Sequence, residues 1–256
     1  MVSERLAGRA ARAGELMARR FGALSGLSGS DLELIEAAAR RLESHSAGAD
    51  LPGRRILVSG WASRRRVMSD GARQIFSFVL PGDPCEGRRR GAVSLVALTP
   101  VETVEAPGLF QAAEDSLLHA GLAEAFEAMR EEEERLLLDH IVRLGRLTAY
   151  ERMAHLLLEL RDRLARVGLA EERRLPMPLT QETLADALGL SIVHVNRTIQ
   201  QLRREGLIEL RSGIAVLHDP DALAELCAYE PLRAPRRTSG PAANVEALAR
   251  ATAPLA

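Results

Sequence analysis

Hydrophobic residues recur at helical spacing along the first fifty positions of the chain. Leu32, Ile35 and Ala39 follow a Ser30-Asp31 pair, and a serine or aspartate before an apolar series is a common helix start. This stretch contains no proline. We therefore expect residues 1–50 to be helical.

From Arg54 the pattern changes to short runs rich in β-branched and aromatic residues, which is typical of strands. The runs are RRILVSG, WASRRRVM, RQIFSFVL, VSLVALT and VETVEA, with Pro100 between the last two. Asp70-Gly71 separates the second run from the third and is a strong signal for a hairpin turn. PGDPCEGRRRG, at 81–91, is predicted to be a loop. Residues 54–106 thus predict a small antiparallel β unit.

A long helical pattern follows Pro107-Gly108 and runs from Gln111 to about Leu147. Its apolar seam consists of Leu118, Leu122, Ala125 and Met129, and resumes after an acidic run with Leu137, Ile141 and Leu144. A helix of about 30 residues spans roughly 45 Å, which is longer than one small domain needs. The narrow seam favours a coiled-coil contact between two copies of the chain. The alternative is a helix that lies along its own domain.

The rest of the chain predicts a second helix, a linker, a compact segment and a tail. The second helix is expected at 149–167, with a buried face made of Met153, Leu156, Leu157, Leu160 and Leu164. EERRLPMPL, at 171–179, is expected to be a linker. The compact segment runs from Thr180 to about Asp219. Because Pro, Gly, Ala and Ser are enriched after 231, we expect the tail to be disordered or weakly helical.

Two short helices joined by a glycine turn are predicted in the compact segment. Gly189 ends the first helix as a residue that tolerates positive φ, Leu190 is placed to fill the corner, and Ser191 is placed to cap the second helix. Val195, Ile199 and Leu202 form the buried face of that second helix. This is a helix-turn-helix. LIEL and IAVL flank Arg211-Ser212-Gly213 and predict a β-hairpin, or wing, directly after it.

The second helix leaves polar side chains on the faces that its core does not use. Arg197 carries a forked guanidinium that can bind guanine O6 and N7. Asn196 can pair with adenine or hold a phosphate, and His194 can donate to a base or to a phosphate. Ser191 and Thr180, with the free amides at helix starts, suit phosphate oxygens. The candidate DNA-binding residues are Thr180, Gln181, Ser191, Val193, His194, Asn196, Arg197 and Gln200.

Charge keeps a second class of function open. The chain carries a net charge of −1 with 34 basic residues, so any attraction to nucleic acid must come from local placement. Between 178 and 218 four arginines are cancelled by four acidic residues. Helix-turn-helix shapes also occur as packing motifs. The alternative is therefore a regulatory or protein-interaction module that has this shape and does not bind DNA.

Composition argues against several other classes. Cys85 and Cys227 are the only cysteines, too few for an iron–sulfur cluster or a structural zinc site. No Ser-His-Asp, phosphate-loop or metal-ligand spacing predicts an enzyme. The Ala/Arg-rich start lacks the apolar core of a secretory signal, and no apolar run approaches 18 residues. We expect a cytoplasmic protein with no membrane partner.

In two long stretches the sequence resembles the Crp/Fnr family of bacterial transcription regulators. ILVSGWASRRRVMSDGARQIFSFVLPGD (56–83) is similar to the family's β-roll sensor domain, and LTQETLADALGLSIVHVNRTIQQLRREGLI (179–208) is similar to its winged helix-turn-helix. The resemblance implies that Arg197 reads guanine and that Ser191 and Thr180 contact the DNA backbone. Members often have Glu where Val193 stands. Val193 cannot accept a hydrogen bond but can pack on a thymine methyl, so we expect the half-site to differ at that base pair.

The sensor half departs from the family pattern. The family's cyclic-nucleotide cassette has a Gly-Glu-Leu, a short helix and a phosphate-binding Arg, and the loop after Gly82-Asp83 is too short for that helix. Glu86, Arg88 and Arg90 give a superficial match and are retained as effector-binding candidates. No cofactor is predicted, and neither cyclic nucleotide nor haem is expected, although His45 and His119 are potential haem ligands.

Cys85 is a further candidate in the sensor half. It lies in an arginine-flanked segment, and neighbouring cations favour the reactive thiolate form of a cysteine. A redox role is therefore a testable expectation.

The expected fold is α+β, with an N-terminal β-roll (jelly-roll-like) sensor domain, a long dimerisation helix and a C-terminal winged helix-turn-helix. The expected boundaries are 1–110 for the β-roll with its N-terminal helices, 111–147 for the dimerisation helix, 148–230 for the DNA-binding domain and 231–256 for a disordered tail. The expected function is a homodimeric transcription regulator that binds a palindromic operator in double-stranded DNA. RNA polymerase is a further candidate partner.

Overall fold

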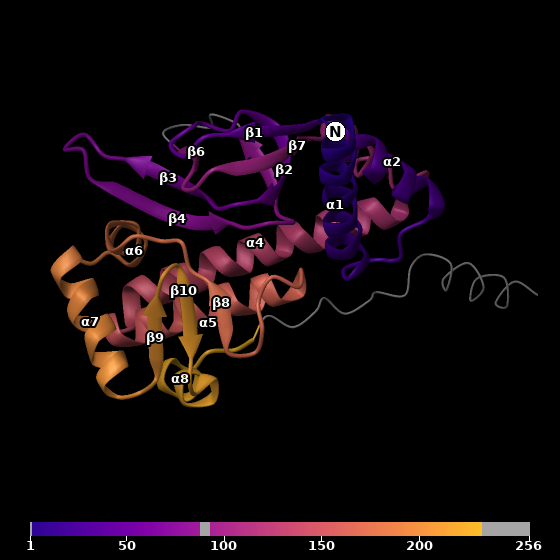
Figure 1. Ribbon diagram of the computed structural model, residues 1–256. Helices are drawn as coiled ribbons and strands as arrows, with labels where there is room; N and C mark the ends of the chain where they lie inside the picture. Colours follow the sequence, from indigo (N-terminus) through magenta and orange to yellow (C-terminus); the bar gives the residue numbers. More distant parts are fainter. Residues whose placement is uncertain (1, 88–92, 232–256) are drawn as a thin grey trace, which may run out of the picture.

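The computed structural model describes residues 2–87 and 93–231. Figure 1 shows a β unit flanked by N-terminal helices, a long helix beneath it, and a second unit of short helices and strands at the far end of that helix. Arg88 and Arg90, and the predicted tail after Pro231, lie outside the described residues.

Two N-terminal helices and seven strands build the first unit. Their bounds are α1 (Val2–Gly22), α2 (Gly29–Ala39), β1 (Leu42–His45), β2 (Gly53–Ser59), β3 (Ala62–Val67), β4 (Arg73–Val79), β5 (Pro84–Gly87), β6 (Val93–Ala97) and β7 (Val101–Glu105). The strands form two antiparallel sheets, ordered β1-β7-β2-β5 and β4-β3-β6. Apolar side chains from both sheets, among them Leu57, Val79 and Leu95, form one buried cluster, so the sheets pack face to face.

The chain passes from one sheet to the other at Gly60. Its φ is +78°, and a Cβ atom there would lie 2.3 Å from the Pro100 carbonyl oxygen. A side chain at this corner would therefore clash as well as strain the backbone. Gly60 thus lets the chain turn sharply from β2, which pairs with β7, into β3, which pairs with β6.

The β unit predicted over 54–106 is confirmed, as is the hairpin at Asp70-Gly71 between β3 and β4. Two local predictions were wrong. Residues 42–45, expected to be helical, form β1, which pairs with β7. Part of the predicted 81–91 loop forms β5, whose Cys85 pairs with Arg55 of β2. In both cases the partner strand supplies hydrogen bonds that local sequence cannot reveal.

The start of α2 is set by a serine two residues earlier than predicted. The Ser28 hydroxyl accepts from the Asp31 amide at 3.2 Å, and the Asp31 carboxylate accepts from the Ser28 amide at 2.9 Å. This reciprocal pair is a capping box. Ile35 and Ala39 are buried as predicted, whereas Leu32 is 40% exposed.

The second half of the described chain is mainly helical. Its elements are α3 (Pro107–Ala112), α4 (Ala120–Arg146), α5 (Ala149–Arg166), β8 (Arg174–Pro176), α6 (Gln181–Leu188), α7 (Ile192–Arg204), β9 (Ile208–Arg211), β10 (Ile214–Leu217) and α8 (Pro220–Cys227). The helix predicted at 149–167 is confirmed by α5, and all five residues of its predicted apolar face are buried. The predicted linker at 171–179 contains β8, which pairs with β10. The helices α3 and α8 were not predicted.

The long helix starts later than the apolar pattern indicated, because the Asp115 carboxylate accepts from the amides of Leu117 and Leu118 and holds a turn there. The predicted continuous seam is also split. Leu122, Ala125 and Met129 pack against α1, α2 and α3 of the same chain. Only the second half leaves apolar side chains in solvent: Leu137, Leu138, Ile141 and Val142 are 37%, 56%, 65% and 53% exposed.

One apolar cluster joins the β unit to the C-terminal unit. Trp61, Ile75, Phe78 and Leu80 of the β unit share it with the buried faces of α5, α6 and α7. In Figure 1, β4 runs above α6. The two units therefore have a common core rather than a loose linker.

A buried ionic network crosses the same junction. Glu159 of α5 pairs with Arg143 of α4 and lies 3.5 Å from Arg163, which in turn pairs with Asp83 at 2.6 Å. The Arg163 guanidinium also donates to the Phe78 carbonyl oxygen at 2.9 Å. Asp83 follows β4, so the network ties the β unit to α4 and α5.

Two histidines next to this network predict a loss of stability in acid. Burial, and secondly the charge of Arg143, lowers the pKa of both His140 and His155 to about 4. In the unfolded chain a histidine pKa is about 6.5. Between these values the unfolded chain binds more protons than the folded one, so the free energy of unfolding should fall as the pH drops from about 6.5 to about 4.

Urea unfolding followed by circular dichroism at several pH values measures this dependence. The double substitution His140→Gln, His155→Gln should flatten it, whereas His194→Gln, at an exposed histidine, should not. An unchanged pH dependence in the double variant would contradict the assignment.

Candidate nucleic-acid interface

The helix α6 is started and stopped by the residues that the sequence singled out. The Thr180 hydroxyl accepts from the Thr183 amide at 3.1 Å and caps the N-terminus. At the other end Gly189 has φ +63° and ψ +38°, the left-handed conformation that favours glycine. A Cβ atom there would also lie 3.4 Å from Leu144 Cδ2 of α4. The turn is therefore specified both by conformation and by packing.

Three residues separate the end of α6 from the start of α7. The Ser191 hydroxyl accepts from the His194 amide at 3.2 Å, which is the predicted cap. Val195, Ile199 and Leu202 are buried, and Ala185 of α6 is buried in the same cluster. A small residue at Ala185 is what allows the two helices to cross closely. The predicted helix-turn-helix is confirmed in the structure.

The opposite face of α7 is open to solvent. Val193 is 61% exposed, and His194, Asn196, Arg197 and Gln200 are exposed beside it. Within the described residues the Arg197 guanidinium makes no hydrogen bond or ion pair. An unpaired guanidinium has all five of its N–H donors available for a ligand.

The structure brings together two of the predicted residues from different helices. The Asn196 amide nitrogen donates to the Gln181 side-chain oxygen at 3.3 Å. Thr180 and Ser191 are exposed, and each hydroxyl is already the acceptor of a helix cap. All eight candidate residues therefore lie on α7 or at the start of α6, on solvent-exposed positions.

The wing lies beside this surface. β9 and β10 pair in register from Ile214↔Arg211 to Leu217↔Ile208, as predicted. Ser212 and Gly213 at the tip have φ values of +51° and +74°, as in a two-residue type I′ hairpin. The other edge of β10 pairs with β8, which fixes the hairpin to the segment after α5.

A contact that the sequence did not reveal holds the far end of α7. The Tyr150 hydroxyl at the start of α5 donates to the carboxylate of Glu205, which caps the end of α7. Burial and the neighbouring carboxylate raise the pKa of Tyr150 to about 12, so it stays a donor. The sequence gives no signal for this pair because the two residues are separated by 55 positions.

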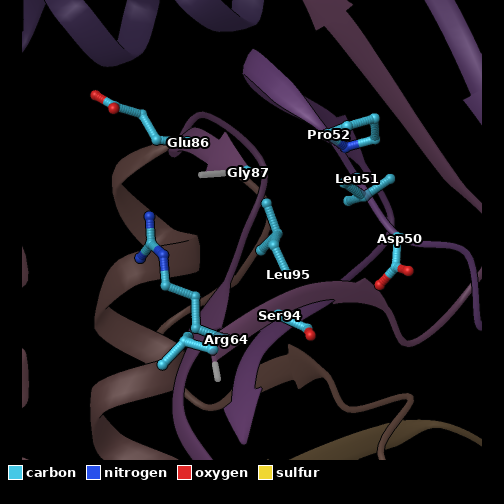
Figure 2. Close-up of a pocket in the computed structure, with 9 residues that line it drawn as sticks. Asp50, Leu51, Pro52, Arg64, Glu86, Gly87, Ser94 and Leu95 are labelled. Atoms are coloured by element: carbon cyan, nitrogen blue, oxygen red, sulfur yellow. The ribbon is translucent and has the colours of Figure 1, made fainter. Parts of the chain in front are cut away.

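Glu86, the effector-binding candidate that falls within the described residues, lines a small cavity of about 50 Å³ between β5, β6 and the segment before β2. Figure 2 shows Glu86 directed away from Leu51 at its edge, with Arg64 on the same side. Pockets for small ligands typically enclose about 300–1,000 Å³, so this cavity is small for an effector. Glu86 also lines a larger cleft of about 810 Å³, together with Arg54 and Phe126 among others, between the sheets and α4.

The expectation of a reactive Cys85 loses its physical basis. Cys85 lies in β5 and is fully buried. Burial raises the pKa of its thiol to about 12, despite the opposing charge of Arg64. A thiol in that environment is protonated at neutral pH and unreactive.

The two histidines considered as haem ligands have protein partners. His45 lies 3.1 Å from the Thr103 hydroxyl, and His119 lies 2.9 Å from the buried Asp31 carboxylate. Within residues 2–87 and 93–231 no group of three or more His, Cys, Asp or Glu side chains is placed to hold a metal ion. Over the same residues, no helix has the length and apolarity needed to cross a bilayer.

The exposed helix α7, the capped helix α6 and the wing formed by β9 and β10 define a DNA-binding transcription regulator. The family profile described as a Crp-like helix-turn-helix domain matches residues 151–226. The nitrogen fixation regulation protein FixK of Bradyrhizobium diazoefficiens is 34% identical over 169 residues, covering 64% of this chain and 69% of FixK. FixK of Rhizobium meliloti is 34% identical over 188 residues, covering 71% and 82% respectively.

The solved structure of FixK2 from Bradyrhizobium japonicum superposes with a TM-score of 0.62 at 29% identity, covering 74% of this chain and 98% of FixK2. The chain belongs to the Crp/Fnr family of transcription regulators. The resemblance stated from the sequence, the α+β fold class and the DNA-binding function are thereby confirmed.

Proposed function

We propose that the chain acts as a homodimer in which each α7 enters the major groove of one half of a palindromic DNA site. The observation that carries this proposal is the exposed, unpaired Arg197 in the first half of a capped helix. Recognition helices of this type contact base edges through their N-terminal residues. The two half-sites would be centred one helical turn apart, about 34 Å.

Each candidate residue has a distinct role in this proposal. Arg197 reads guanine through a bidentate contact, and Asn196, oriented by Gln181, pairs with adenine or a phosphate. Val193 packs on a thymine methyl, and His194 and Gln200 contact neighbouring bases or phosphates. The helix starts at Thr180 and Ser191 present backbone amides to phosphate oxygens.

Selection from random duplexes tests the proposal. Repeated rounds with the full chain should enrich a palindrome, and the affinity for it should fall steeply between about 50 and 200 mM salt through counterion release. The rival function is a regulatory module that binds another protein through the same scaffold. That rival is favoured by the balanced charge of residues 178–218, and it predicts that no sequence is enriched.

The dimer is supported by the apolar face that α4 leaves uncovered. Leu137, Leu138, Ile141 and Val142 lie on neighbouring turns, and contiguous exposed apolar side chains usually mark an interface. Packing two such faces together would give the coiled-coil contact expected from the sequence. Because Leu122, Ala125 and Met129 are used within the chain, the contact would be confined to the second half of α4.

Ile141→Glu is expected to convert the dimer to a monomer, because it places a charge in the centre of an apolar contact. Analytical ultracentrifugation measures the change. Leu169→Glu is the matched control, since Leu169 is also exposed (42%) and lies outside α4. A variant at Ile141 that sediments as the wild type does would overturn the assignment of this face.

The sensor domain is proposed to have lost the family's cyclic-nucleotide cassette. The support is the short segment after Asp83, which forms the strand β5 and not a helix. Thermal shift measurements with cyclic nucleotides, haem and oxidants test this directly, since a ligand at 100 times its Kd adds about 2.7 kcal/mol. We further propose that the protein acts in the cytoplasm, has no enzyme activity, and meets RNA polymerase at its DNA site.

A further inference from the structure

An arginine of the β3–β4 hairpin pairs with both carboxylates of α6, the helix that precedes α7. Arg73, the first residue of β4, places Nη2 2.6 Å from Glu182 Oε1 and Nε 2.8 Å from Asp186 Oδ2. Glu182 and Asp186 are one turn apart on α6. Two adjacent N–H groups of the guanidinium therefore each pair with a different carboxylate, and charge-assisted contacts of this kind are stronger than neutral hydrogen bonds.

The pairing is part of a larger contact between β4 and α6. Ile75 of β4 and Ala187 of α6 are buried in the same cluster and line one small cavity. Asp186 is 19% exposed and Arg73 32%, whereas Glu182 is 61% exposed at the start of α6. The arginine thus lies at the edge of an apolar interface and faces the end of α6 that carries Thr180 and Gln181.

The charges of α6 are unfavourable for binding a polyanion. Glu182 lies in the first turn of the helix, two residues after the Thr180 cap, and Asp186 follows on the same face. Like charges four residues apart also repel each other along a helix. No basic side chain of residues 178–188 offsets them, and the ion pairs that compensate them come from Arg73, 109 positions before Glu182 in the chain.

We propose that Arg73 is a positioning residue for DNA binding: it fixes α6 against the β unit and screens Glu182 and Asp186 from the DNA phosphates. The position of the β3–β4 hairpin thereby sets the DNA affinity of the helix-turn-helix. This inference rests on the proposed placement of α6 and α7 against DNA. It assigns a DNA-binding role to a residue of the sensor domain that touches neither bases nor phosphates.

The test compares Arg73→Ala with Arg66→Ala in the full chain. Arg66 lies opposite Gln74 in the same hairpin, is exposed and contacts neither carboxylate of α6. Both variants remove one positive charge, so a difference between them reports the pairing. Arg65 is unsuitable as a control because its charge also acts on Asp186.

Arg73→Ala is expected to weaken binding about three- to tenfold at low salt, with a much smaller loss at higher salt where the repulsion is screened. The loss should be similar for a selected palindrome and for an unrelated duplex, because phosphates are common to both. Adding Glu182→Gln and Asp186→Asn to Arg73→Ala should restore the affinity. Fluorescence anisotropy with labelled duplexes, at a temperature where every variant is folded, measures all four proteins.

Three outcomes would overturn the proposal: affinity equal to that of Arg66→Ala, tighter binding than the wild type, or a loss that the two added substitutions do not restore. A purely structural role would lower the melting temperature without a salt-dependent change in affinity. If the proposed base reading is wrong, the wild type should bind the palindrome and the unrelated duplex with equal affinity. That result is distinct from the three outcomes above.

Discussion

Arg197→Ala is expected to lose about 1–3 kcal/mol of binding free energy, or roughly five- to 150-fold in Kd, for a selected palindrome. The structure supplies the reason: Arg197 is exposed on α7, and within the described residues it makes no hydrogen bond or ion pair that the substitution would break. The fold should therefore survive intact. Because a bidentate contact distinguishes guanine from other bases, the preference at one G·C pair should relax.

Two further variants separate base reading from charge. Arg197→Lys keeps the charge but lacks the fork, so it should also lose preference at that base pair. Arg203→Ala removes an exposed arginine from the last turn of α7 and should weaken binding to all duplexes alike. Selection and anisotropy measurements check both. If Arg197→Ala bound the palindrome as tightly and selectively as the wild type, the base-reading role would be wrong.

Glu159→Gln is expected to lower the free energy of unfolding by about 3–5 kcal/mol, because it leaves the buried Arg143 charge without its carboxylate partner. Arg143 and Arg163 have side chains only 2% and 6% exposed. Burial alone would raise the pKa of Glu159, but the two guanidinium groups hold that pKa below its ordinary value. The carboxylate therefore contributes stability at neutral pH that is lost as the pH falls through the folded-state pKa.

Urea unfolding at neutral pH measures the loss. Glu124→Gln, at an exposed position of α4, is the control and should change the free energy of unfolding by less than about 0.5 kcal/mol. Replacing the pair as Arg143→Met with Glu159→Met should recover part of the loss, because no unpaired charge is left between these two positions. A cost for Glu159→Gln no larger than that of the control would show that the network does not stabilise the junction.

The helix-turn-helix was predictable because its signals are local. Thr180, Gly189 and Ser191 each act within four residues of their own position, as caps or as a left-handed turn. The outward position of Arg197 follows from the same helical period that buries Val195 and Ile199. For this part of the chain, spacing along the sequence is also proximity in space.

The elements that sequence reasoning missed depend on distant partners. β1 and β5 are short strands that exist because β7 and β2 offer them hydrogen bonds. Of the predicted apolar seam, Leu122, Ala125 and Met129 are buried within the chain and Leu118 lies outside α4. An apolar pattern cannot say whether its partner is another copy or the chain's own α1 and α2. Cys85 shows the same limit, since its arginine neighbours in sequence suggested a thiolate, whereas its burial in β5 raises the pKa of the thiol.

Among the charged residues between 178 and 218, the structure most changes the interpretation of Glu182 and Asp186. In the sequence they were counted as two negative charges that cancel two arginines of the same segment. In the structure their partner is Arg73, which no spacing rule connects to α6. Local charge counts describe a DNA-binding surface poorly when a second domain contributes to it.

The core shared by Trp61, Ile75 and Phe78 with α5 and α6 limits how such a protein can be remodelled in evolution. A substitution in β4 that suits a new signal must still fit Ala187 and Leu188, which support the recognition helix. The β unit and the helix-turn-helix therefore cannot be exchanged between relatives as independent modules. A new combination would need new side chains at the shared core, and we expect compensating substitutions to accumulate there together.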